Sequence, residues 1–176
     1  MKRRTKKRIK QAAQTFMSQL LWTIRDLADA MPSPFETKGQ YQRRVWSNLP
    51  RYPVQKIQFG MSRLKQQGLA RESKKRRFVL ELTLEGRRKL LIRQISSKRK
   101  PTRDGRSTII IFDIPEEKRR HRAFLRRLLL KNGFMNLQKS VLISRFELPD
   151  EFFELLKELG LYQNVTMIKG QIQFRS

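Results

Sequence analysis

The chain has 176 residues, enough for one or two domains, and a formal net charge of +26 from 41 Lys and Arg against 15 Asp and Glu. This charge exceeds what solubility requires and predicts a polyanionic partner. The absence of cysteine excludes disulfides and thiol chemistry, and the single histidine excludes a pair of histidine ligands within one chain. No apolar run approaches the roughly 18 residues of a membrane span, so we expect no membrane partner.

The positive charge is concentrated in the front part of the chain. Residues 1–106 hold 29 basic and 7 acidic residues, whereas residues 107–176 hold 12 and 8. The segment 97–106 contains Pro, Gly and charged residues without any large apolar side chain, a composition typical of a linker. We therefore expect a basic arm at 1–8, a basic domain at 9–96, this linker, and a nearly balanced domain at 107–176.

The basic domain is expected to begin with three helices. Apolar residues recur at steps of three and four from Ile9 to Met31, which predicts a long amphipathic helix. A short second helix is expected at Gln40–Ser47. Pro53 suits the first position of a third helix, and Gly68 is suited to end it. Trp22 and Trp46 are expected in the core.

A β-hairpin and a final helix are expected after these helices. Phe78, Leu80 and Leu82 alternate with other residues, which predicts a half-buried strand. Five basic residues within Arg71–Arg77 surround the expected tip. A last helix follows from 84 to 95. Three helices followed by a hairpin with a basic tip are the arrangement of a winged helix-turn-helix.

This arrangement predicts contacts with double-stranded DNA. A helix in the major groove offers polar and basic side chains to base edges, while a hairpin tip reaches phosphates or the minor groove. The residues expected to contact DNA are Gln55, Lys56, Gln58, Ser62 and Arg63 on the third helix, Lys74, Lys75, Arg76 and Arg77 in the hairpin, and Arg3, Arg4, Lys6 and Lys7 in the arm. Glutamines also occur on solvated helix faces, so their role as base readers stays open. The arm is expected to attract phosphates without reading sequence.

The second domain is expected to alternate strands and helices. The apolar run Thr108–Phe112 predicts a buried strand, and Pro115 starts a helix that Gly133 closes. One or two strands are expected in 134–147, then a helix from Pro149 and a terminal hairpin that turns at residues 169–170. This order is close to the ferredoxin-like split βαβ arrangement. The fold class expected is α+β, an N-terminal winged helix-turn-helix followed by a ferredoxin-like domain.

Particular stretches resemble known families. The stretch MSRLKQQGLARESKKRRFVLELTLEG resembles the end of the winged helix of bacterial repressors. Phe112-Asp113-Ile114, an Arg-rich helix and the run LQKSV at 137–141 resemble the small CRISPR-associated nuclease and integrase-adaptor proteins. The same domain is similar to the middle of the phenylacetate-catabolism repressor (PaaX-like) family, in which a winged helix precedes it. The domain order of this chain matches the repressor family.

The resemblance to the repressor family implies a dimeric transcriptional regulator that binds double-stranded DNA. The ferredoxin-like domains would pair to form a homodimer, and two winged helices would read the halves of a palindrome. This function requires no cofactor. We therefore expect a repressor without enzymatic activity, cytoplasmic and associated with the nucleoid of a prokaryote.

The resemblance to the CRISPR-associated family leaves a second function open. The protein would then be a metal-dependent nuclease, or a noncatalytic adaptor of spacer acquisition with a CRISPR integrase as partner. In that family the aspartate matching Asp113 is proposed to hold a divalent ion between two subunits, so Asp113 is the candidate catalytic and Mg²⁺-binding residue. Taken from the residues alone, Asp113 also fits an ordinary helix cap, and Glu116 and Glu117 fit acids at a helix start.

Overall fold

The computed structural model describes residues 15–25, 35–47, 52–74, 79–103 and 105–171. The chain divides into two compact units, residues 1–90 and 91–176, and each is described by itself. The basic arm at 1–8 lies outside the described residues. None of the described helices is long and apolar enough to cross a membrane.

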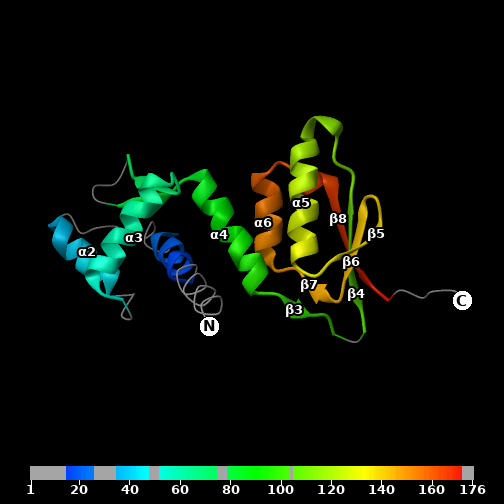
Figure 1. Ribbon diagram of the computed structural model, residues 1–176, viewed down its shortest axis with the longest axis horizontal. Coiled ribbons are helices and arrows are strands. Elements are labelled where there is room, and N and C mark those ends of the chain that lie inside the picture. Colours follow the sequence, from blue (N-terminus) through cyan, green and yellow to red (C-terminus); the bar gives the residue numbers. More distant parts are fainter. Residues whose placement is uncertain (1–14, 26–34, 48–51, 75–78, 104, 172–176) are drawn as a thin grey trace, which may run out of the picture. The chain divides into compact units, whose positions relative to one another are not determined.

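The first unit contains helices and one antiparallel hairpin (Figure 1). Residues 15–25 are helical, within the long helix expected at 9–31, whose two ends lie outside the described residues. The later elements are α2 (Lys38–Trp46), α3 (Val54–Gln66), β1 (Ala70–Glu72), β2 (Leu80–Leu82) and the beginning of α4 (Leu84–Ser97). This order confirms the expected winged helix-turn-helix.

Local interactions fix where these elements begin. Thr37 and Gln40 form a capping box at α2: the Thr37 hydroxyl accepts from the Gln40 N–H at 3.4 Å, and the Gln40 side chain accepts from the Thr37 N–H at 2.9 Å. At the start of α4, the Thr83 hydroxyl accepts from the Gly86 N–H at 3.1 Å and donates to the Gly68 carbonyl at 2.6 Å. The hairpin and α4 are thereby joined at one threonine.

The core of the first unit buries the apolar stripe of each helix. Leu20 and Ile24 of the first helix belong to the same core as Ile57 and Leu64 of α3. Gly60 of α3 lies so close to the first helix that a Cβ atom would overlap the side chain of Leu20. The packing therefore fixes which face of α3 is buried and which is exposed.

Trp22 is not the core residue that its size suggested. Its side chain is 37% exposed, and the Arg25 guanidinium carbon lies 5.6 Å from its ring centroid. The reason is position on the helix, because Leu20 and Ile24 occupy the buried face and Trp22 lies between them in sequence. The side chain of Trp46 lies outside the description.

The second unit is a four-stranded antiparallel sheet with helices on one face (Figure 1). Its strand order is β5-β6-β4-β8, the order of a ferredoxin-like fold. The elements are β4 (Ser107–Phe112), α5 (Arg119–Lys131), β5 (Met135–Gln138), β6 (Val141–Ser144), α6 (Asp150–Glu158) and β8 (Val165–Gly170), with 3₁₀ turns at Glu116–Lys118 and Tyr162–Asn164. The expected ferredoxin-like class is confirmed.

The segment 97–106, expected as a linker, carries secondary structure instead. Helix α4 continues to Ser97, and Leu91 and Ile95 are buried in the core of the second unit. After two intervening residues, β3 (Lys100–Pro101) pairs with β7 (Phe146–Glu147). The composition suggested a linker because both residues of β3 are exposed, and a short exposed strand lacks the alternating apolar pattern of a buried one.

The terminal hairpin was expected to turn at residues 169–170, and this expectation was wrong. Lys169 and Gly170 belong to β8 and pair with Thr108 and Ser107 of β4. A Lys-Gly dipeptide is compatible with a turn, but the ladder with β4 holds it extended along the full length of that strand. Residues 172–176 lie outside the described part of the chain.

Candidate nucleic-acid interface

Helix α3 presents one continuous exposed stripe. Ile57, Gly60 and Leu64 form its buried side. The residues on the opposite side are spaced by four, three and four positions and are all exposed: Gln55, Phe59, Ser62 and Gln66. No residue of α3 is acidic. This side of the helix can therefore approach a polyanion without like-charge repulsion.

The polar residues predicted to read bases lie on or beside this stripe. Gln55, Gln58, Ser62 and Arg63 are exposed, and their side chains make no hydrogen bond or ion pair within the described part of the chain. Their amide, hydroxyl and guanidinium groups are free to meet a ligand. Hydrogen-bonding groups of these kinds are the ones used to read base edges.

Gln58 and Ser62 also border a hollow of about 390 Å³ in the first unit. Helix α2 contributes Lys38 and Tyr41 to its wall, and the hairpin contributes Leu80. Gln58 therefore lies on the flank of α3 that is turned toward α2, whereas Gln55 lies on the outward stripe.

Lys56 is held differently from the other predicted contacts on α3. Its ammonium nitrogen lies 4.7 Å from the ring centroid of Tyr52 and 5.1 Å from that of Phe16. The two rings meet edge to face at 4.6 Å. The cation is thus positioned over an aromatic pair at the start of α3, where it remains exposed.

Two ion pairs organise the hairpin. Arg71 and Glu81 face each other across the strands, with Nε and Oε1 3.1 Å apart. Glu72 meets Lys65 of α3 at 2.8 Å, and this hydrogen bond lowers the pKa of Glu72 below its ordinary value. Both acids of the hairpin strands are therefore paired with cations, and Lys74 follows them on the way to the tip.

Only part of the predicted phosphate-binding set is described. Lys74 is exposed just after β1. The residues outside the description are Lys75, Arg76 and Arg77 of the hairpin and Arg3, Arg4, Lys6 and Lys7 of the arm. Their contacts with phosphate stay a prediction from the sequence.

Asp113 follows β4 and is fixed through its main chain. Its N–H donates to the Asn164 carbonyl at 2.9 Å, and its carbonyl accepts from the Asn164 side-chain amide at 3.0 Å. Its carboxylate is exposed and makes no hydrogen bond or ion pair within the described residues. Pro115, not Asp113, is the N-cap of the following 3₁₀ turn, so the expected capping role was wrong.

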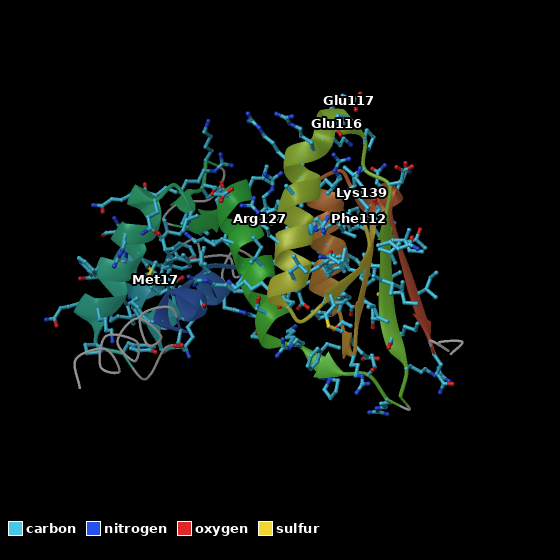
Figure 2. The ribbon with its side chains drawn as sticks, turned by 45° about the vertical axis from the view of Figure 1, so that its right-hand side comes forward. Met17, Phe112, Glu116, Glu117, Arg127 and Lys139 are labelled. Carbon is cyan, nitrogen blue, oxygen red and sulfur yellow. The ribbon has the colours of Figure 1, made fainter. Side chains whose placement is uncertain are left out.

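The acids near Asp113 in sequence are Glu116 and Glu117, which lie in the 3₁₀ turn just before α5 (Figure 2). Glu116 forms an ion pair with Arg122 at 2.7 Å, and Arg122 also donates to the Ile114 carbonyl at 3.2 Å. Within the described ranges, no group of three or more His, Cys, Asp or Glu side chains is placed to hold a metal ion. The described residues of one chain therefore provide no such cluster around Asp113.

The outer face of the sheet is rich in isoleucine. Ile110 and Phe112 of β4 are buried, so Ile109 and Ile111 point to the other side of the strand. Ile109 is paired with Ile143 on one side and with Ile168 on the other. Ile111 and Ile168 are 38% and 44% exposed. We call Ile109, Ile111, Ile143 and Ile168 the outer isoleucine face.

Neither this face nor the exposure of Phe59 was predicted from the sequence. In an apolar strand the sequence does not show which alternate residues a helix will cover. Phe59 carried a weak signal: it lies two positions after Ile57 and off the apolar stripe of α3.

The two units together define a protein with a winged helix followed by a ferredoxin-like domain. Residues 100–175 match the family model described as PaaX protein central Cas2-like domain, which covers the second unit from β3 onward. This match shows that the second unit contains a domain of the kind found at the centre of PaaX proteins. No curated protein matches the chain.

Proposed function

We propose that this chain is a cytoplasmic, dimeric transcriptional regulator of the repressor type that reads double-stranded DNA with α3. The observation that carries the proposal is the outward side of α3, which is exposed, free of acids and lined by Gln55, Ser62 and Gln66, with Arg63 exposed beside it. A helix of this kind in a winged-helix unit has the shape and the hydrogen-bonding groups to enter the major groove.

The charge distribution supports the same partner. Residues 1–106 carry 29 of the 41 basic residues and 7 of the 15 acidic ones. In the proposed complex Lys74, Lys75, Arg76 and Arg77 of the hairpin contact phosphates, and the arm adds further nonspecific attraction. Such contacts release counterions, so the affinity should fall steeply as salt rises.

The outer isoleucine face supports the dimer. Helices α5 and α6 cover one face of the sheet (Figure 1). The isoleucines of three neighbouring strands lie on the other face. Exposed apolar patches of this kind commonly mark interaction surfaces. In the proposed homodimer this face packs on its counterpart in a second copy, which would present two winged helices to a palindrome.

The experiment that tests this function is selection of a random duplex library at about 0.2 M salt, where purely electrostatic binding is much reduced. An enriched palindrome is the expected result. If nothing is enriched and all binding disappears with rising salt, the regulator proposal is contradicted.

A second candidate function rests on the Cas2-like match and on the exposed carboxylate of Asp113. Since one chain lacks a metal-binding cluster within its described residues, a nuclease would need Asp113 from two copies of the chain. Cleavage of DNA that depends on Mg²⁺ and is abolished in Asp113→Asn would favour the nuclease. Copurification with a CRISPR integrase, with no cleavage, would favour the adaptor.

A further inference from the structure

Phe59 is exposed at the middle of the outward stripe of α3. Its side chain is 68% exposed, although it is one of the largest apolar side chains in the first unit. Gln55 precedes it by four residues and Ser62 follows by three, so polar side chains flank it on the same side of the helix. The core beneath α3 is filled by Ile57 and Leu64, and Phe59 adds nothing to it.

The exposed phenyl ring of Phe59 would be stabilised by contact with an apolar group of a binding partner. The base edges in the major groove carry hydrogen-bond donors and acceptors and one apolar group, the C5-methyl of thymine. A phenyl ring cannot hydrogen-bond, so facing adenine, guanine or cytosine it would remove water from polar groups without replacing their hydrogen bonds. Only thymine offers this side chain a favourable contact.

We propose that Phe59 is a specificity-determining residue that packs against the C5-methyl group of a thymine in the major groove. This inference rests on the proposed DNA-binding function and adds to it the base that the centre of α3 selects. The polar neighbours Gln55 and Ser62 then face the adjoining base pairs, where glutamine is suited to adenine. The absence of acids on α3 lets the helix come close enough for van der Waals contact.

The test uses the full-length protein and the duplex enriched from the random library. Each thymine in one half-site is replaced in turn by deoxyuridine, which removes only the methyl group. The affinity of the wild-type protein should fall about fourfold at one thymine, the value expected when a methyl group is no longer buried. In Phe59→Ala the same replacement should leave the affinity unchanged.

Two further variants control the experiment. Phe59→Leu keeps an apolar side chain and should retain part of the preference for thymine. Phe35→Ala removes an exposed phenylalanine of the same unit that lies outside α3, and it should keep the full preference. Because Phe59 is exposed, Phe59→Ala should show the circular dichroism spectrum of the wild type.

The proposal is overturned if no thymine methyl affects wild-type binding, or if Phe59→Ala keeps the wild-type preference for that methyl group. These results differ from failure of the proposed function, in which the wild-type protein would enrich no sequence at all.

Discussion

Gly86, in the first turn of α4, lies directly against the main-chain carbonyl of Leu69, where the chain enters the hairpin. A Cβ atom on Gly86 would overlap that oxygen. The same carbonyl accepts a hydrogen bond from the Thr83 N–H at 3.1 Å, so it cannot move away without breaking the junction. Because residue 86 is a glycine, the first turn of α4 can pack closely against the segment that leads into the β1–β2 hairpin.

Gly86→Ala should lower the free energy of unfolding of the first unit by about 3 kcal/mol, because the overlap is with backbone and cannot relax by a rotamer change. Urea unfolding followed by tryptophan fluorescence measures this, since both tryptophans precede residue 90. The control is Gly39→Ala in α2, where no atom lies within 4 Å of the added methyl group. That variant should be unchanged or more stable by up to about 1 kcal/mol; equal destabilisation in both would contradict the packing argument.

Gln55→Ala should relax the sequence preference at one base pair while leaving the others intact. A good bidentate contact discriminates by about 1–3 kcal/mol, so the preferred base should lose most of its advantage. Gln58→Ala tests whether base reading extends to the flank of α3 turned toward α2. Affinities for a panel of single-base variants of the selected site measure both effects. An equal decrease on every DNA would show that the residue supports binding without reading sequence.

Replacing Arg76 and Arg77 together by alanine should weaken binding on all sequences alike. The slope of log affinity against log salt should become shallower by about one for each phosphate that the variant no longer neutralises. Titrations at several salt concentrations give the slope. Lys157→Ala, which removes a positive charge from α6 of the second unit, is the control and should leave the slope of log affinity against log salt unchanged. If the slope of the double variant equals that of the wild type, the two arginines of the hairpin do not contact phosphates.

Ile111→Glu should convert the proposed dimer into a monomer, because it places a charge in the centre of an apolar contact. The side chain is exposed in a single copy, so the fold should be retained. Sedimentation velocity measures the change. Leu130→Glu, an exposed apolar residue on α5, is the matched control and should leave the association state as in the wild type. Dimers that persist in Ile111→Glu would place the interface elsewhere.

Lys65→Met should raise the pKa of Glu72 toward the ordinary value of a glutamate, because the variant removes the ammonium group that stabilises the charged carboxylate. In the native protein the hydrogen bond from Lys65 lowers this pKa. The pair therefore adds stability above the unfolded pKa, which disappears as the pH falls through the lower folded pKa. Titration of the Glu72 carboxyl by NMR measures the shift. Lys65→Arg should keep the pKa low, and a pKa unchanged in Lys65→Met would contradict the assignment of its cause.

Much of the fold follows from local patterns in the sequence. The periodicity of α3 depends on residues three and four positions apart, and the start of α4 depends on Thr83 and Gly86 within one turn. The exposed pair of residues in β3 has no such pattern, because its partner β7 is more than forty residues away in the chain. The turn expected at Lys169-Gly170 failed for the same reason, since β4 decides that this dipeptide stays extended.

The amino-acid sequence by itself determined that residues 1–106 are strongly basic and residues 107–176 nearly balanced in charge. It also determined the order of the main helices and strands, and it supplied the residues that we propose to contact DNA. These properties depend on composition and on short-range periodicity. Tertiary structure alone decided that Phe59 and Gln55 share the outward side of α3, that Trp22 is exposed, and that the isoleucines of the outer face lie together. The physical reason is that burial is settled by which element packs on which face, and residues distant in the sequence make those contacts.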